Sequence, residues 1–335
     1  MILVTGGTGL VGSHLLYELI KEDKPIKAIY RDEKKLSIVK KVFSYYCKNP
    51  EELFKKIVWV KADLLDISLL TEAFKDVTYV YHCAAFVSFE PNKYHLLRKT
   101  NIEGTANIVN FCIANHVEKL CYVSSIATIG TAINSDIDDE ETIWNPEADN
   151  SVYGITKYGA EMEVWRGTQE GLDVVIVNPG VIIGPGIWEY GSGNIFEKVY
   201  KGLPFFTEGA VGYVAVFDVV TCMIRLMEGQ IKNERFILVA ENMSYKDFIN
   251  QIAKTLRVKA PTKKAGSFLL NLGWRLDWIH HKLTGKPRTL SKQLANSLET
   301  KSAYNNSKIK TLLNYTFIPI DKSIEAVSSI FIKEH

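Results

Sequence analysis

The chain opens with Met1-Ile2-Leu3-Val4-Thr5-Gly6-Gly7-Thr8-Gly9-Leu10-Val11-Gly12. Residues 1–5 predict a buried β-strand, and the apolar period after them predicts a helix over residues 10–22. Glycines at these positions allow a sharp turn, close approach of a phosphate and tight packing of the helix on the strand. The helix start adds free amides and the positive end of its dipole. We therefore expect a dinucleotide pyrophosphate to contact Thr5, Gly6, Gly7, Thr8, Gly9, Leu10, Val11 and Gly12, with an ordinary tight turn as the alternative.

Apolar runs and helical patterns alternate along the first half of the chain. Strands are predicted at residues 1–5, 26–30, 57–60, 79–82, 119–123 and 174–178, and helices include residues 94–115 and 153–167. Continuous apolar strands separated by helices indicate a parallel sheet covered on both faces. The right-handed crossover rule then gives an α/β doubly wound parallel sheet, with its ligand crevice at the carboxyl ends of the strands.

The pattern changes after Pro179, where a glycine-rich loop precedes a mostly helical tail. We expect residues 1–180 to form a dinucleotide-binding domain, with residues 213–240 returning to it, including a strand at 235–240. Residues 181–212 and 241–335 would then form a smaller, mostly helical substrate lobe.

Composition excludes several classes of function. The 335 residues carry a formal net charge of +2, which gives no strong field for nucleic acid or an anionic membrane. The five cysteines are irregularly spaced and resemble buried apolar residues of a reducing compartment. A strand begins at the first residue and no apolar run is long enough to cross a bilayer, so we expect a cytoplasmic protein without membrane or nucleic-acid partners.

A second group of residues has the chemistry of a proton-transfer site. Tyr153 and Lys157 are four residues apart, which places them on one face of the predicted helix. A lysine ammonium there would lower the pKa of the tyrosine and make it a usable acid or base. Ser124 and Ser125 end a predicted strand, where a hydroxyl points into the crevice and can donate to a carbonyl oxygen. An exposed helix pair and a helix-capping serine are the alternatives.

Taken in order, these motifs resemble the extended short-chain dehydrogenase/reductase family, within the NAD-dependent epimerase/dehydratase superfamily, which has a Rossmann fold. The resemblance covers nearly the whole chain. It includes Thr5–Gly12, Asp63-Leu64, His82-Cys83-Ala84-Ala85, Asn101–Thr105, Val123-Ser124-Ser125, Tyr153 with Lys157, Asn178-Pro179-Gly180 and Gly184-Pro185-Gly186.

The resemblance implies roles for individual residues. Tyr153 would transfer the proton, Lys157 would hold the nicotinamide ribose, and Ser125 would polarise the reacting oxygen; Ser125 is preferred to Ser124 because it precedes Gly130 by five residues. Further cofactor contacts are implied for Asp63, Leu64, Ala84, Ala85, Asn101, Ser124, Tyr153, Lys157, Pro179, Gly180 and Val181. Substrate contacts are expected from Ser88, Phe89 and Ser125, and no metal is expected.

The choice of cofactor depends on the end of the second strand. An acidic residue there binds a free ribose hydroxyl, whereas an arginine suits a 2′-phosphate. This chain has Tyr30 followed by Arg31, which favours NADP(H). Asp32 keeps NAD(H) as the alternative, because a shift of one residue would place its carboxylate near the ribose.

Two branches of the family compete for the activity. Sugar-nucleotide epimerases and dehydratases usually carry an acidic strand end and a Val-Tyr-Gly-Pro-Arg segment, whereas this chain has Arg31 and Val181-Ile182-Ile183-Gly184-Pro185-Gly186. Val87-Ser88-Phe89 and Tyr304–Lys308 also resemble the dihydroflavonol 4-reductase-like and 3β-hydroxysteroid dehydrogenase-like branch. We therefore predict an NADP(H)-dependent oxidoreductase for a small ketone or aldehyde and its alcohol. An NAD-dependent nucleotide-sugar epimerase or dehydratase and a non-catalytic dinucleotide sensor are the alternatives, and a homodimer is a family expectation.

Three remaining features have unremarkable interpretations. The side chains of His280 and His281 point apart on a helix, so the two are poorly placed to bind one metal ion together. The acidic run 136–141 lacks the glycine and spacing of a calcium loop and predicts a solvated loop. The apolar residues of segment 268–279 are expected to pack in a core, with a lid over an apolar substrate or a membrane-surface contact as alternatives.

Overall fold

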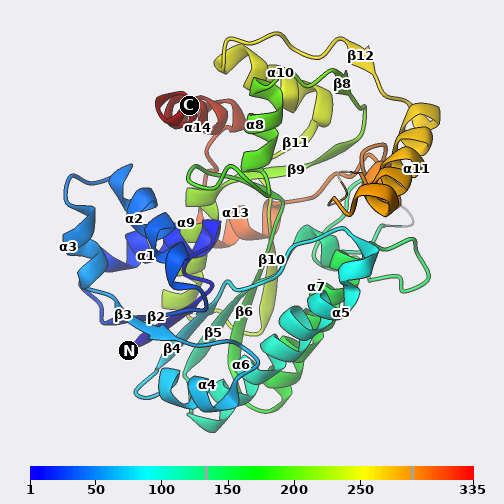
Figure 1. Cartoon of the computed structure of the whole chain (residues 1–335). Coiled ribbons are helices and arrows are strands. Elements are labelled where there is room, and N and C mark those ends of the chain that lie inside the picture. The colour runs from blue at the N-terminus through cyan, green and yellow to red at the C-terminus, as the bar shows by residue number, and fades with distance from the viewer. Residues whose placement is uncertain (133–134, 287, 289) are drawn as a thin grey trace.

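The computed structural model describes residues 1–132, 135–286, 288 and 290–335. In this part of the chain seven parallel strands form one sheet, in the order β10-β6-β5-β4-β1-β2-β3 (Figure 1). The strands are β1 Ile2–Thr5, β2 Ile26–Tyr30, β3 Val58–Lys61, β4 Tyr79–His82, β5 Lys119–Val123, β6 Asp173–Pro179 and β10 Glu234–Leu238. The order reverses on either side of β1, so the fold is the doubly wound parallel sheet that the alternating pattern predicted.

Helices cover both faces of this sheet. One face carries α1 Leu10–Ile20, α2 Leu36–Ser44, α3 Pro50–Lys55, α9 Val216–Glu228 and α13 Ser307–Leu313. The other carries α4 Ile67–Ala73, α6 Gly104–Ala114 and α7 Val152–Gln169, with the short α5 Tyr94–Leu97 beside α7. Alternate residues of β1 supply the two cores, because Val4 packs with the first group of helices and Leu3 with the second. Burial on both faces explains why the strands read as continuous apolar runs.

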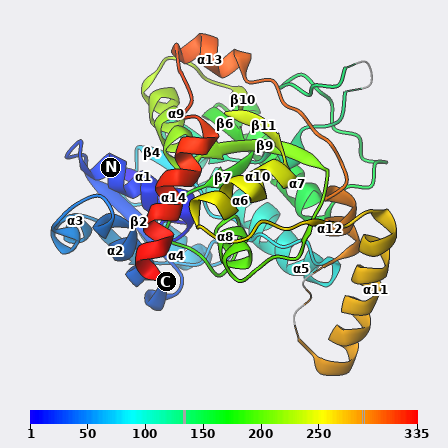
Figure 2. The ribbon, with the colours of Figure 1, turned by 90° about the horizontal axis from the view of Figure 1, so that it is seen from above.

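A smaller lobe lies over the carboxyl end of the sheet (Figure 2). Its three-stranded sheet, within the described residues, has the order β11-β9-β7 and consists of β7 Val181–Ile183, β9 Ala210–Ala215 and β11 Glu241–Ser244. It packs with α8 Gly193–Tyr200, α10 Tyr245–Thr255 and α14 Ile320–Glu334 around a separate apolar core. Two short strands, β8 Phe205–Phe206 and β12 Lys263–Lys264, precede α11 Ser267–Thr284 and α12 Lys292–Ser297.

Three predictions from the sequence were wrong in detail. The helix expected over residues 94–115 is divided, because a π-helical turn at Arg98–Glu103 separates α5 from α6. The acidic run is not fully solvated: Asp138 accepts the amide of Ala132, and Glu140 accepts the amide of Ile237 at 2.8 Å, so both carboxylates are buried. Segment 268–279 does not pack in a core, since most of its large apolar side chains are exposed.

Short turns complete the described structure. They are the 3₁₀ turns at Glu33–Lys35, Pro91–Lys93 and Ile126–Thr128. Across the residues described, no helix combines the length and the apolar character needed to cross a membrane.

Candidate active site

The glycine-rich turn has the geometry of an anion cradle. Gly6 has a φ of +67°, and a Cβ there would lie 2.6 Å from the backbone nitrogen of Ala84. A Cβ on Gly12 would lie 2.2 Å from the carbonyl oxygen of Gly6. Gly9 is the N-cap of α1, makes no side-chain cap and is followed by no acidic residue in the first turn. The first amides of α1 therefore remain available to a phosphate group, as the fit of a dinucleotide requires.

The end of β2 places a cation at the carboxyl end of the strand that pairs with β1, the strand that precedes this cradle. Arg31 has a side chain 66% exposed and pairs with Asp63 across 3.6 Å. Asp32 is occupied elsewhere, since its carboxylate accepts the amide of Lys34 at 3.0 Å. Asp63 also accepts the amide of Leu65. The Asp32 carboxylate, on which the NAD(H) alternative depended, thus caps a 3₁₀ turn. The guanidinium of Arg31, by contrast, faces solvent.

The end of β4 is fixed to the end of β1 by side chains. The hydroxyl of Thr5 contacts Nδ1 of His82 at 2.6 Å and accepts the amide of Ala84 at 3.2 Å. Nε2 of His82 contacts the hydroxyl of Thr105 at 2.9 Å. Burial, assisted by the charge of Lys157, lowers the pKa of His82 to about 3, so this imidazole is neutral. Thr5 has a buried structural role in addition to the cofactor role proposed for its segment.

Asn101 lies within the π-helical turn and fixes the loop that follows β4. Its side chain accepts the amide of Phe86 at 2.7 Å and donates to the Phe86 carbonyl at 3.0 Å. It also donates to the hydroxyl of Thr156 on α7 at 3.2 Å. π-Helical turns frequently occur at functional sites. Here the turn connects the loop that carries Ala84 and Ala85 to the helix that carries Tyr153.

Tyr153 and Ser125 meet at the carboxyl end of β5. Ser125 follows this strand and caps the next turn by accepting the amide of Ala127 at 3.1 Å, and it hydrogen-bonds Tyr153. The Phe89 ring lies 5.5 Å from the Tyr153 ring. Burial raises the pKa of Tyr153 to about 12, and the hydrogen bond from Ser125 acts in the opposite direction. The hydroxyl is therefore protonated at neutral pH and can donate.

Lys157 is buried below this pair and faces two oxygen atoms of β5. Its Nζ donates to the hydroxyl of Tyr122 at 2.6 Å and to the carbonyl of Val123 at 2.8 Å. Burial lowers the pKa of Lys157 to about 7, against the nearby carboxylate of Glu161. The expectation that Lys157 lowers the pKa of Tyr153 was wrong for this arrangement, because the ammonium is directed to Tyr122 and the shift of Tyr153 comes from burial and Ser125.

A buried carboxylate behind the serines was not predicted from the sequence. Glu161 accepts from Ser124 at 2.5 Å, Thr128 at 2.8 Å and Asn178 at 2.9 Å through one oxygen. Its other oxygen pairs with Arg235 at 3.2 Å. Glu161 lies four residues after Lys157, so its place on the same helix face was the signal available in the sequence. The hydroxyl of Ser124 points into this network, and Ser124 stays a cofactor contact only as a prediction.

The remaining predicted residues lie around the same end of the sheet. Pro179 ends β6, the amide of Gly180 donates to Leu238, and Val181 begins β7. Leu64 is buried against the start of α6, where a Cβ on Gly104 would lie 3.0 Å from it. Ser88 accepts the amide of Glu90 at 3.2 Å in the loop before α5. The structure therefore gathers the predicted residues at the carboxyl ends of six neighbouring strands, β6, β5, β4, β1, β2 and β3.

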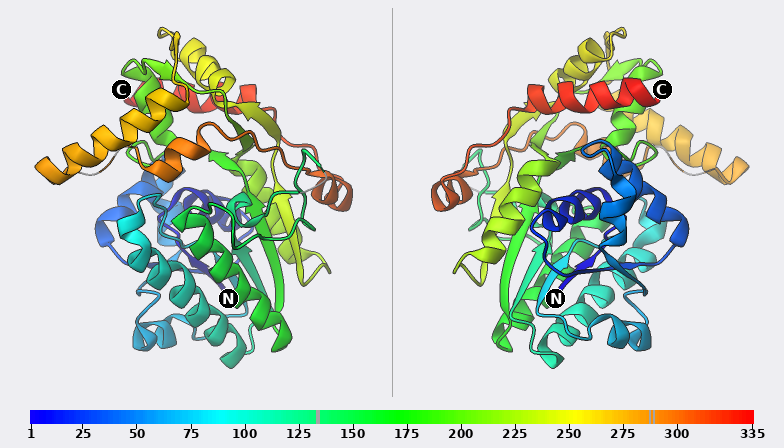
Figure 3. Two further views of the ribbon diagram at one scale, coloured as in Figure 1. Left: turned by 90° about the vertical axis from the view of Figure 1, so that its right-hand side faces the viewer. Right: turned by 90° about the vertical axis from the view of Figure 1, so that its left-hand side faces the viewer.

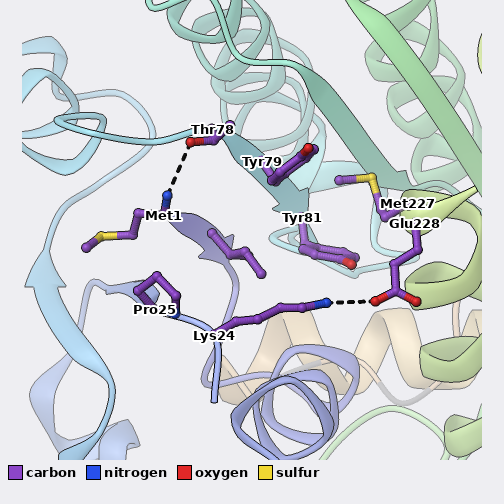
Figure 4. A pocket seen from close by; sticks show the side chains of 9 residues that line it. Met1, Lys24, Pro25, Thr78, Tyr79, Tyr81, Met227 and Glu228 are labelled. Carbon is purple, nitrogen blue, oxygen red and sulfur yellow. Dashed lines mark hydrogen bonds and ion pairs between the residues drawn. The ribbon is translucent and has the colours of Figure 1, made fainter. Parts of the chain in front are cut away.

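Two hollows lie elsewhere. One, of about 430 Å³, is lined by residues that include Met1, Lys24, Thr78 and Glu228, and Lys24 pairs with Glu228 across it (Figure 4). It adjoins the amino ends of β1 and β4, so it lies at the sheet edge opposite the predicted site. A second hollow, of about 480 Å³, is lined by residues that include Trp144, Tyr158 and Arg235. We assign neither to the cofactor.

The fold and the residues gathered at the carboxyl ends of its strands are those of an enzyme of the nicotinamide-dinucleotide class. Residues 2–238 match the model of the NAD dependent epimerase/dehydratase family, and the chain belongs to that family. It is 27% identical over 281 residues to a putative dihydroflavonol 4-reductase of Synechocystis, covering 81% of this chain and 77% of that protein. It is 23% identical over 296 residues to an Arabidopsis thaliana 3beta-hydroxysteroid-dehydrogenase/decarboxylase, covering 82% and 67%. The structure of a Thermotoga maritima UDP-glucose 4-epimerase with UDP-glucose superposes with a TM-score of 0.77 and 21% identity, covering 99% of each chain. The chain is accordingly an NAD(P)-dependent enzyme.

Proposed function

We propose that this enzyme interconverts a ketone or aldehyde and the corresponding alcohol with NADP(H). The observation that carries the proposal is the hydrogen-bonded pair of Ser125 and Tyr153, with Lys157 buried on the same helix one turn away. A hydroxyl donor, a protonated phenol and a cation at one strand end are what carbonyl reduction requires of a protein. The relative named as a dihydroflavonol 4-reductase supports the same class of reaction.

Each residue has a defined task in this proposal. The cofactor, when bound, would supply the hydride that the carbonyl carbon accepts. Ser125 donates a hydrogen bond to the carbonyl oxygen and polarises it, and Tyr153 delivers the proton that turns this oxygen into a hydroxyl. Lys157 holds the nicotinamide ribose and keeps a positive charge beside the site. In the opposite direction Tyr153 accepts the proton from the alcohol.

The substrate side of the proposed site is apolar. Val87 and Phe89 are both exposed in the loop that follows β4, and the Phe89 ring lies beside Tyr153. Exposed apolar side chains next to a proton donor suit an aromatic or hydrophobic carbonyl compound. We therefore place the apolar part of the substrate against Phe89 and the carbonyl group between Ser125 and Tyr153.

The preference for NADP(H) rests on Arg31. Its guanidinium is exposed at the end of β2, Tyr30 occupies the usual acidic position, and the Asp32 carboxylate already accepts a backbone amide. A guanidinium can bind a 2′-phosphate through two parallel hydrogen bonds. Asp63 is its present partner and would release it to the phosphate.

One assay separates this proposal from nucleotide-sugar epimerisation, which the likeness to the UDP-glucose 4-epimerase fold keeps as the second candidate. The full chain is incubated with NADPH and a panel of aromatic and aliphatic ketones and aldehydes, and separately with UDP-sugars. The proposal expects the nicotinamide absorbance to fall in step with alcohol formation. In Ser125→Ala the absorbance should stay constant and no alcohol should form. Interconversion of two UDP-sugars without net change in absorbance, and no reduction across the panel, would overturn it.

A further inference from the structure

Helix α11 projects from the substrate lobe (Figure 3). Its side chains include several exposed large apolar residues. Its large apolar side chains include Phe268, which is 84% exposed, and Leu283, which is 81% exposed. Among the residues that the structure describes in α11, only Leu270 is buried. A helix with so little buried surface in its own chain has an unused apolar face.

The exposed residues form one stripe along the helix. Phe268, Leu272, Leu276, Ile279 and Leu283 follow at intervals of four, four, three and four residues. At about 100° per residue they fall within an arc of roughly 80°. All five are exposed. This apolar stripe is therefore continuous and points away from the protein.

The opposite side of α11 fixes the helix to the lobe. Leu270 and Trp274 pack with residues that include Ala295 and Leu298 of the α12 region. Asp277 pairs with Arg288 at 3.4 Å, and both of these side chains are largely buried. Gly285 closes the helix in a left-handed conformation. The orientation of the apolar stripe is thus set by contacts on the other face, and the stripe needs no refolding to be presented.

Two cations flank one edge of the apolar stripe, and each lies over a tryptophan ring of the same helix. The guanidinium of Arg275 lies over the Trp274 ring at 4.5 Å, and Nζ of Lys282 lies over the Trp278 ring at 4.5 Å. Both cations are exposed and project beside the stripe. Aromatic rings paired with long basic side chains are typical of the boundary between lipid headgroups and acyl chains. The sequence of the helix contains one carboxylate, Asp277, which faces the lobe.

We propose that α11 is a membrane-surface helix that seats this enzyme on a bilayer containing anionic phospholipid. The apolar stripe would enter the headgroup and acyl boundary, while Arg275 and Lys282 contact lipid phosphates. A second copy of the chain fits this surface less well. An antiparallel two-fold pair places the basic edge of one helix against that of the other, and a parallel pair gives these cations no acidic partner. The proposal is independent of the chemistry at Tyr153.

Binding of the full chain to sedimenting vesicles tests this proposal. We expect binding to vesicles of phosphatidylglycerol and phosphatidylcholine, weaker binding to phosphatidylcholine alone, and release by salt. Leu276→Glu combined with Leu283→Glu should lower the affinity at least about tenfold, since each leucine withdrawn from lipid forfeits its transfer free energy. Arg275→Gln with Lys282→Gln should lower affinity for the anionic vesicles about fivefold per charge and leave binding to neutral vesicles unchanged.

A matched control is Ile143→Glu, because Ile143 is 83% exposed in a loop outside α11. It should bind vesicles like the unmodified chain. Thermal melting and light scattering of every variant separate a folding defect or a change of oligomer from lost lipid contact. Absence of vesicle binding, equal binding by the double leucine variant, or a dimer that this variant dissociates without vesicle binding would each overturn the proposal.

Discussion

Nζ of Lys157 donates to the hydroxyl of Tyr122 at 2.6 Å, and this contact joins the helix of the proton donor to the core of the sheet. Tyr122 in turn hydrogen-bonds Thr105, which contacts His82, and His82 contacts Thr5 in the strand before the glycine turn. Five side chains from β1, β4, α6, β5 and α7 thus form one buried hydrogen-bonded chain. Because buried polar groups are costly when unpaired, this chain holds the lysine and the phosphate turn in a fixed relation.

Replacing Tyr153 by phenylalanine should remove turnover without removing cofactor binding. The phenol is the proposed proton donor, and loss of a positioned general acid usually costs about 10²–10⁴ in rate. NADPH affinity, measured by fluorescence titration, should change little. Tyr158→Phe is the matched control on the same helix, because Tyr158 stacks on Trp144 and lines the second hollow with it. A Tyr153→Phe enzyme with an unchanged rate would assign the proton to another group.

Affinity for NADPH should depend on pH through Lys157. Burial lowers the pKa of this lysine to about 7, so its positive charge is present below that pH and is lost as the pH rises through it. Binding of the anionic cofactor should therefore weaken on the alkaline side, as isothermal titration at successive pH values would show. The carboxylate of Glu161 raises the pKa of Lys157, so Glu161→Gln should move the weakening to lower pH.

Glu163→Gln is the control for the Glu161→Gln variant. Glu163 lies on the same helix but pairs with Arg166 at the surface. It should leave the pH profile where it is. A Glu161→Gln enzyme that melts at a lower temperature but keeps the unmodified pH profile would show that Glu161 is structural alone.

The main sheet could be predicted from the sequence because burial on both faces leaves continuous apolar runs, which are easy to recognise between helical patterns. β1, β2, β4 and β5 begin and end within a residue of their predicted positions, and the strand expected at 235–240 is β10 beside β6. Periodicity did not reveal the π-helical turn, because inserting one residue into a helical turn leaves the apolar pattern nearly intact. Asn101 of this turn contacts the loop after β4, and a contact between distant segments leaves no trace in the periodicity.

The site was predictable where a residue type itself has chemistry, as for Tyr153, Lys157 and the glycines. The pair of Glu161 and Arg235 was not predicted, because these residues are 74 positions apart in sequence and meet only in the folded chain. The exposure of the apolar residues of α11 was not predicted for a different reason. An apolar stripe has the same period whether it faces a core or solvent, and its partner is decided by how the rest of the lobe packs.

Arg31→Ala should weaken NADPH binding more than NADH binding. A hydrogen bond to a charged group is worth about 1.5–3 kcal/mol, so the affinity for NADPH should fall by about tenfold or more. Calorimetric titration of both cofactors gives the ratio directly. Arg98→Ala is a suitable control, since Arg98 is also an exposed arginine paired with one carboxylate, that of Glu103. Equal losses for the two cofactors would show that Arg31 does not read the 2′-phosphate.

Asp218 should make the stability of the fold depend on pH. Burial raises the pKa of this carboxyl from 3.8 to about 6, although Tyr315 and the amide of Ile318 donate to it. The folded state therefore holds the proton more tightly than the unfolded state, and the stabilisation present at low pH is lost as the pH rises from about 4 to about 6. Up to about 3 kcal/mol of the free energy of unfolding depends on this group, at 1.36 kcal/mol per pKa unit.

Asparagine cannot ionise, so Asp218→Asn should flatten this part of the profile when chemical denaturation is followed between pH 4 and pH 7. Asp23→Asn is the control, because the carboxylate of Asp23 is 86% exposed and its backbone has the positive φ of 56° that asparagine tolerates. The control should keep the slope of the unmodified protein. If Asp218→Asn also keeps that slope, the carboxyl titrates in the fold as it does in the unfolded chain, and the pH dependence must come from other groups such as Asp138 and Glu140, whose pKa values burial also raises.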